Sequence, residues 1–93
     1  MVVARRYLVR GRVHRVGFRA FAEHAAHREG LTGFVRNLAD GRVEAVAKGD
    51  RSALDRFERA LRGGPMLARV DALAIDDVAP PGGTTGFRIL DDR

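Results

Sequence analysis

The chain has 93 residues, a net charge of +5 and no cysteine. Its length fits a single domain over residues 1–93, and the absence of cysteine excludes disulfides, thiolate nucleophiles and cysteine-based metal sites. Seventeen basic residues against twelve acidic ones favour an anionic partner, without distinguishing nucleic acid from a small phosphate ester.

The first part of the chain predicts a strand followed by a helix. Polar and apolar residues alternate over Val3–Arg12, with Tyr7 and Val9 on the same face, so we expect one buried and one solvated face. From Phe18 onward, apolar residues recur at spacings of three and four. This spacing predicts an amphipathic helix that ends near Glu29.

A β-hairpin is expected next. Its strands are Thr32–Asn37 and Arg42–Lys48, and the turn between them contains Gly41, which is free to adopt a positive φ. A second helix should follow. Ser52, with Asp55 three positions later, is typical of an N-terminal cap, and Gly63–Pro65 should end the helix.

The last part of the chain predicts two strands. Ala68–Val78 is the first, with an irregularity near Asp71, and Phe87–Leu90 is a short final strand after a loop over Pro80–Gly83. The order is βαββαβ with one additional strand. It predicts an α+β fold, the ferredoxin-like split βαβ sandwich, in which two helices cover one face of an antiparallel sheet.

The stretch from Gly11 to Arg19 is the candidate functional site. It must turn sharply between a strand and a helix, and the start of a helix carries unpaired N–H groups that favour an anion. Arg12, Arg15 and Arg19 surround the same turn, which predicts an oxyanion such as phosphate. The alternative is a short connecting loop that happens to be rich in Gly and Arg.

Two segments resemble the signature segments of the acylphosphatase family. The first family segment reads Gly-x-Val-Gln-Gly-Val-x-Phe-Arg, and this chain has Gly11-x-Val13-His14-Arg15-Val16-x-Phe18-Arg19. The second corresponds here to Gly33-Phe34-Val35-Arg36-Asn37 with Gly41, Val43 and Gly49. The resemblance spans nearly the whole chain. Chance agreement is improbable, because both segments occur at the right separation within a matching order of elements.

The resemblance implies metal-independent hydrolysis of the carboxyl-phosphate anhydride of acyl phosphates, without a cofactor. The residues that match the catalytic pair of the family are Arg19, as a charge stabiliser, and Asn37, as the group that holds the attacking water. The loop that would bind phosphate, chiefly through main-chain amides, consists of Val13, His14, Arg15, Val16, Gly17, Phe18 and Arg19.

Simpler roles compete for some of these residues. Arg19 in a first helical turn is ordinarily a solvated charge, and Asn37 at the head of a hairpin is ordinarily a turn residue. Without the family resemblance we would prefer the turn role for Asn37. The aromatic side chains are expected in the core rather than in contact with substrate, namely Phe18, Phe21, Phe34 and Phe57.

The chain departs from the family pattern at two positions. Arg15 replaces a glycine, and a positive φ there would cost on the order of 1 kcal/mol. We expect the Arg15 side chain to extend over the pocket as an additional contact to phosphate or carboxylate. His14 replaces a glutamine, and we expect it to be a hydrogen-bonding spacer rather than a titrating catalyst.

A metal site is not expected. His24 and His27 lie three residues apart on the first helix but have no evident third ligand, so we expect two exposed histidines. The expected partners are a small-molecule acyl phosphate and inorganic phosphate or sulfate. We expect no membrane partner and no signal peptide, and hence a cytoplasmic location. A monomer is a separate expectation.

Two other classes of function remain as alternatives. A nucleic-acid-binding module of the same fold needs aromatic side chains on the solvated strands for base stacking, and Arg42–Lys48 has none. Weak, salt-sensitive binding through the basic residues stays open. A phosphate-binding domain without turnover is favoured only by the altered loop, since a fold does not guarantee chemistry.

Overall fold

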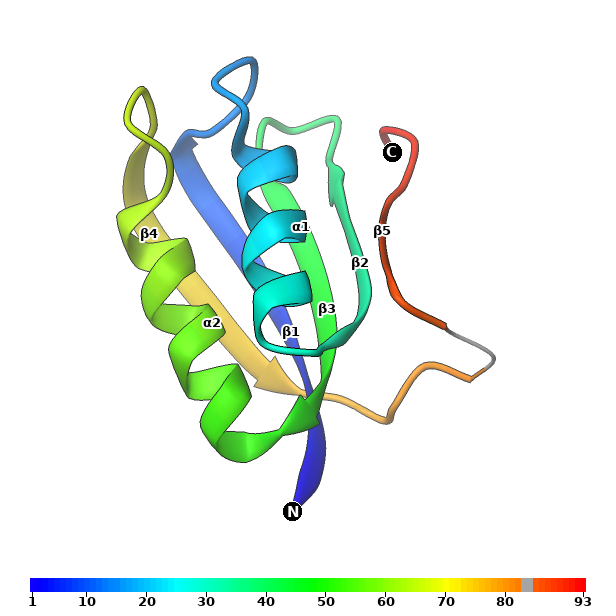
Figure 1. Ribbon diagram of the computed structural model, residues 1–93. Coiled ribbons are helices and arrows are strands. Elements are labelled where there is room, and N and C mark those ends of the chain that lie inside the picture. Colours follow the sequence, from blue (N-terminus) through cyan, green and yellow to red (C-terminus); the bar gives the residue numbers. More distant parts are fainter. Residues whose placement is uncertain (83–84) are drawn as a thin grey trace.

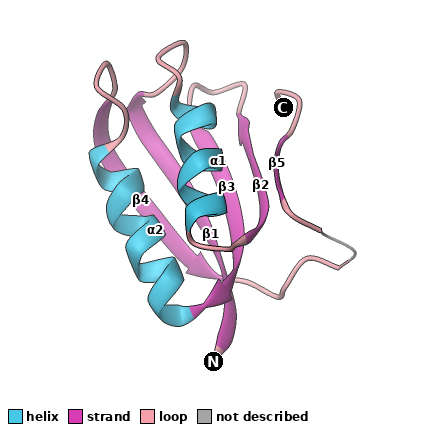
Figure 2. Ribbon diagram, in the orientation of Figure 1, coloured by secondary structure: helices cyan, strands magenta, loops and turns pink. Residues whose placement is uncertain are grey.

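The computed structural model describes residues 1–82 and 85–93. Both helices cover the same face of a single sheet (Figures 1 and 2), which confirms the expected α+β ferredoxin-like sandwich. Gly83, at the end of the expected loop, lies outside the described residues. The elements in chain order are β1 (Val2–Arg12), α1 (Phe18–Arg28), β2 (Thr32–Asn37), β3 (Val43–Asp50), α2 (Arg51–Gly63), β4 (Arg69–Asp77) and β5 (Phe87–Ile89).

The sheet has the strand order β4-β1-β3-β2-β5. The four longer strands pair antiparallel, as expected from the sequence, with Tyr7 of β1 opposite Ala45 of β3 and Ile75 of β4. Strand β5 pairs in parallel with β2, so that Val35 lies opposite Ile89. This parallel edge makes the sheet mixed, and it carries the C-terminal residues along β2.

The core fills the space between the helices and the sheet. Small alanines on β3 and α1 allow the helices to approach the sheet closely, and Phe57 of α2 packs edge-on against Tyr7 and Phe87, with ring centroids 5.6 and 5.9 Å apart. The contact with Phe87 fixes β5 to the core. The largest fully buried side chains are Tyr7, Phe18, Phe57, Leu54, Leu61, Val9, Val13, Val35 and Val43.

The expected burial of the phenylalanines is only partly correct. Phe18 and Phe57 are buried, whereas Phe21 is half-buried beside Phe18. Phe34 is half-buried on the open face of the sheet, because it alternates along β2 with the fully buried Val35. The guanidinium of Arg36 lies 5.2 Å from the centre of the Phe34 ring.

Two local features show how the sequence shapes the elements. The irregularity expected near Asp71 is present, because Arg10 pairs with Ala72 and Gly11 with Val70, which leaves Asp71 as an extra residue in β4. The expected cap of α2 is wrong: Asp50, in extended conformation at the end of β3, accepts a hydrogen bond from the Ser52 N–H. Helix α2 therefore begins at Arg51.

None of the helices in the described part of the chain is long and apolar enough to cross a membrane.

On the open face of the sheet, a buried carboxylate on the central strand β3 forms ion pairs with arginines on the neighbouring strands β1 and β2. Glu44 is 5% exposed and accepts hydrogen bonds from the Nε atoms of Arg6, at 2.6 Å, and Arg36, at 2.7 Å. Burial by itself raises the pKa of Glu44, but the two arginines outweigh burial and hold that pKa below its usual 4.5. The resulting stabilisation is present above pH 4.5 and is lost as the pH falls through the lower folded-state pKa.

Replacing Glu44 tests its bridge to Arg6 and Arg36. Glu44→Gln should lower the free energy of unfolding at pH 7 by about 2 kcal/mol, because it leaves two guanidinium groups without a charged acceptor. It should also flatten the acid-induced loss of stability between about pH 5 and 3. Urea unfolding at a series of pH values measures both effects, with Asp91→Asn, which removes an exposed carboxylate, as the control. Identical acid dependence in the wild type and Glu44→Gln would contradict the bridge.

Candidate active site

The loop over residues 13–17 ends in a helix start that is open to an anion. Gly17 is the N-cap of α1, with a φ of 77°, and it has no side chain that can accept from the first-turn amides. The first turn contains no acidic residue either. The first helical hydrogen bond runs from the Phe21 N–H to the Gly17 carbonyl, at 3.0 Å. The amides before Phe21 therefore keep the capacity to bind an external acceptor.

The main chain of the loop is curled by two left-handed residues. Gly17 is one, and Arg15, with a φ of 61°, is the other; no other non-glycine residue in the described ranges has a positive φ. Left-handed residues in such a turn make successive N–H groups converge into a concavity that suits an anion. The structure thus confirms the positive φ that we considered for Arg15.

Three contacts hold this loop in place. Val13 and Phe18, at its two ends, are buried in the core. Between them, Nε2 of His14 lies 2.9 Å from the carbonyl oxygen of Arg42, which ties the loop to the connection between β2 and β3. His14 therefore has the spacer role expected from the sequence.

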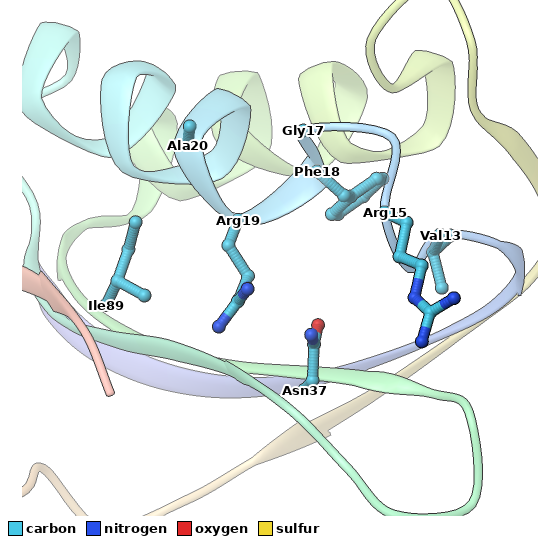
Figure 3. A pocket seen from close by; sticks show the side chains of 8 residues that line it. All are labelled: Val13, Arg15, Gly17, Phe18, Arg19, Ala20, Asn37 and Ile89. Atoms are coloured by element: carbon cyan, nitrogen blue, oxygen red, sulfur yellow. The ribbon is translucent and has the colours of Figure 1, made fainter. Parts of the chain in front are cut away.

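A cavity of about 240 Å³ opens between this loop, the start of α1 and the ends of β2 and β5. In Figure 3, the side chains of Arg19 and Asn37 lie near one another in its middle, and Arg15 lies on the other side of Asn37 from Arg19. The structure thus brings together the two side chains that the family resemblance identifies as catalytic. The residues that line the cavity are Val13, Arg15, Gly17, Phe18, Arg19, Ala20, Asn37 and Ile89.

Asn37 is a buried polar side chain without a full set of partners. It is 7% exposed, and its Oδ1 atom accepts no hydrogen bond from any described residue. Leaving such an atom unpaired costs roughly 1–3 kcal/mol, so its position in the wall of a cavity indicates a ligand or a water as the missing partner. This observation distinguishes Asn37 from a simple turn residue.

Arg19 is held by the C-terminal residues. Its guanidinium lies 3.0 Å from the Asp92 carboxylate, and these two side chains are 38% and 65% exposed. The backbone of Arg93 donates to the Asn37 carbonyl at 2.9 Å, which extends the alignment of β5 with β2 and brings Asp92 to α1. An exposed ion pair of this kind contributes at most about 1 kcal/mol, so the guanidinium can exchange Asp92 for an anionic ligand.

The chemistry of the lining limits what the cavity can do. The described lining residues offer two guanidinium groups, one carboxamide and main-chain amides, and none carries a carboxylate, hydroxyl or imidazole. Such a set can bind an oxyanion and position a water, but it supplies no side-chain nucleophile. No group of three potential metal ligands occurs in the described part of the chain. His24 and His27 are exposed, as expected, and Nε2 of His27 lies 3.0 Å from the Phe87 carbonyl.

The acylphosphatase family model matches residues 5–89 of the chain. The chain belongs to the acylphosphatase family. An acylphosphatase of Koribacter versatilis is 53% identical over 85 residues, which cover 91% of this chain and 77% of that relative. One of Thermus thermophilus is 48% identical over 82 residues, covering 88% and 92%. The crystal structure of an acylphosphatase from Bacillus subtilis superposes with a TM-score of 0.90 at 36% identity, covering 97% of this chain and 99% of that one.

For this acylphosphatase, the sequence identified most of the cavity but not all of it. Of the loop residues predicted to bind phosphate, His14 and Val16 are not in the lining of the cavity, since His14 turns to Arg42 and Val16 packs against the core. That the main-chain amides of His14 and Val16 bind phosphate remains a prediction. Arg12 is exposed and also lies outside the lining. The sequence gave no reason to include Ala20 and Ile89, because only the parallel pairing of β5 places Ile89 there.

The strained arginine in the loop gives a prediction for stability. Arg15→Gly should raise the free energy of unfolding by about 0.5 kcal/mol, because relief of the left-handed conformation exceeds the entropy that glycine adds to the unfolded chain. Urea unfolding measures the change. Arg12→Gly removes the same charge from the end of β1 and should instead lower stability. Equal losses in both variants would contradict strain at Arg15.

Proposed function

We propose that this acylphosphatase hydrolyses acyl phosphates with main-chain amides, one guanidinium and one carboxamide. The amides of the loop, from about Arg15 to Arg19, surround the phosphoryl oxygens, and Arg19 neutralises their charge. Asn37 holds the attacking water. The observation that carries the proposal is the buried Oδ1 of Asn37, which lacks a partner among the described residues and lies near Arg19 in one cavity.

The reaction requires the protein mainly to position the substrate and the water and to stabilise the charge of the phosphoryl group. An acyl phosphate is already activated: water attacks phosphorus, the bond from phosphorus to the bridging oxygen breaks, and the carboxylate leaves with the electron pair. The water releases its protons to solvent or to the phosphate product. A loose, metaphosphate-like transition state places little charge on the entering oxygen, so no general base is required. A lining without carboxylate or imidazole supports this mechanism.

The direct test compares two phosphate compounds in the presence of a chelator. The protein should release phosphate rapidly from benzoyl phosphate and should leave phenyl phosphate, a stable monoester of similar size, intact. Ethylenediaminetetraacetate should not change the rate, because neither Arg19 nor Asn37 acts through a metal in the proposed mechanism. Dependence on an added metal, or equal cleavage of the two compounds, would contradict the proposal.

The role of Arg19 predicts a large loss of rate. Arg19→Ala should reduce kcat/KM for benzoyl phosphate by at least about a thousandfold, the size expected when a principal charge stabiliser is removed. Arg28→Ala, which removes an exposed arginine from the other end of α1, is the matched control. A loss of less than about tenfold in Arg19→Ala would rule out the assigned role.

Asn37 should affect turnover and binding differently. Asn37→Ala should abolish turnover while leaving competitive inhibition by inorganic phosphate nearly intact, since the phosphate is held by the loop and Arg19. Steady-state kinetics with phosphate as the inhibitor separates the two effects. Equal loss of turnover and of phosphate inhibition would indicate that Asn37 supports the structure of the site rather than the water.

The alternatives have less support. Phe34 faces the open side of the sheet, but Arg36 lies over its ring, so a base stacked on that face would have to displace the guanidinium. A phosphate-binding domain without turnover would leave the Asn37 carboxamide without a use, and the benzoyl phosphate assay distinguishes it. The cytoplasmic location and the monomeric state stay predictions from the sequence.

A further inference from the structure

The mouth of the cavity has two chemically different sides. Asn37 forms a buried part of the wall, 7% exposed. Ile89, 39% exposed, and Ala20 lie together on the Arg19 side, whereas Arg15 and Val13 lie on the opposite side (Figure 3). The side that carries Arg19 thus adds an apolar surface from Ile89 and Ala20, whereas the opposite side carries the Arg15 guanidinium.

The two arginines of the cavity differ in their partners. Arg19 is paired with Asp92 at 3.0 Å. Arg15 is an exposed residue, and its guanidinium makes no hydrogen bond or ion pair with any residue in the ranges 1–82 and 85–93. Among the described lining residues there is also no carboxylate to neutralise it. Arg15 therefore presents an uncompensated positive charge to whatever enters.

The expected pose of the substrate decides what Arg15 meets. The amides from about Arg15 to Arg19 hold the phosphoryl group, and the attacking water lies on the buried Asn37 carboxamide. In-line attack places the leaving acyl oxygen on the far side of phosphorus from Asn37, so the acyl group points toward the mouth of the cavity. Arg15 is an exposed residue of the cavity lining, whereas Asn37 is buried, and from this difference we place the Arg15 guanidinium nearer to the mouth. The acyl group, not the phosphoryl group, is then the part of the substrate beside the Arg15 guanidinium.

We propose that Arg15 selects acyl phosphates whose acyl group carries a second negative charge, specifically a carboxylate. This inference rests on the proposed hydrolysis of acyl phosphates. The planar fork of a guanidinium matches a carboxylate with two parallel hydrogen bonds. Strained conformations often occur at functional sites, and Arg15, with a φ of 61°, makes no side-chain hydrogen bond or ion pair with any described residue that would compensate its strain.

The test uses two rigid substrates that differ only in charge. One is 4-carboxybenzoyl phosphate, and the other is 4-carbamoylbenzoyl phosphate, which is neutral at the same position; the ring prevents the carboxylate from attacking its own anhydride. The measured quantity is the ratio of their kcat/KM values. A ratio within one protein, compared between variants, cancels both the intrinsic reactivity of the substrates and any general effect on the loop.

Arg15→Asn removes the charge but keeps a residue that tolerates a left-handed conformation. The ratio should fall about fivefold from its wild-type value, the size of an exposed charge pair of about 1 kcal/mol. Arg12→Asn makes the same change of charge outside the cavity lining and should keep the wild-type ratio. Addition of 0.5 M salt, roughly five times the concentration that gives a 10 Å screening length, should reduce the ratio in the wild type.

The other outcomes overturn the inference in distinguishable ways. If Arg15→Asn slows both substrates by the same factor and weakens inhibition by inorganic phosphate, Arg15 contacts the phosphoryl group and does not select the acyl group. If Arg12→Asn lowers the ratio equally, only the net charge of the protein matters. Hydrolysis of neither substrate by the wild type would overturn the proposed function itself, and this inference with it.

Discussion

The site depends on unpaired amides at the start of α1. The peptide dipoles of a helix leave partial positive charge at its first turn, and here the cap residue is a glycine and the first turn has no acidic side chain, so nothing in the helix itself neutralises that charge. Left-handed residues such as Arg15 and Gly17 favour convergence of further N–H groups on the same place. We propose that a bound anion pairs with these amides.

The rest of the fold serves to hold other groups beside these amides. Val13 and Phe18 anchor the loop in the core, and the end of β2 places Asn37 opposite the first helical turn. The parallel strand β5 adds Ile89 to the wall and brings Asp92 to Arg19. Asn37 and Ile89 thus lie at the ends of packed strands, whereas Asp92 follows β5 in the C-terminal residues.

Much of the architecture could be predicted from local patterns. Alternation predicted β1, the spacing of apolar residues predicted α1, and the irregularity expected near Asp71 is the bulge of β4. Local patterns failed where two neighbouring residues are equally good candidates for the same role. Ser52 and Asp50 are both good caps, and only the backbone of Asp50 places its carboxylate at the first turn of α2.

The site was less predictable, because its members meet only through long-range pairing. Asn is a common residue in turns, so from the sequence only the family resemblance indicated a role for Asn37 in the site. The fold adds a second indication, a buried oxygen without a described partner. Phe34 was assigned to the core by residue type, although strand alternation with Val35 places it on the open face. Ile89 and Asp92 depend on a parallel pairing across more than 50 residues of chain, for which the sequence holds no short-range signal.

The most direct test of the central claim is a titration of the ¹⁵N-labelled protein with inorganic phosphate, followed through the amide resonances. The account predicts that the largest shifts occur at the main-chain amides from Arg15 to Arg19, together with the side-chain amide of Asn37. Shifts confined to the open face of the sheet, or saturable binding that leaves the resonances of this loop unmoved, would contradict it.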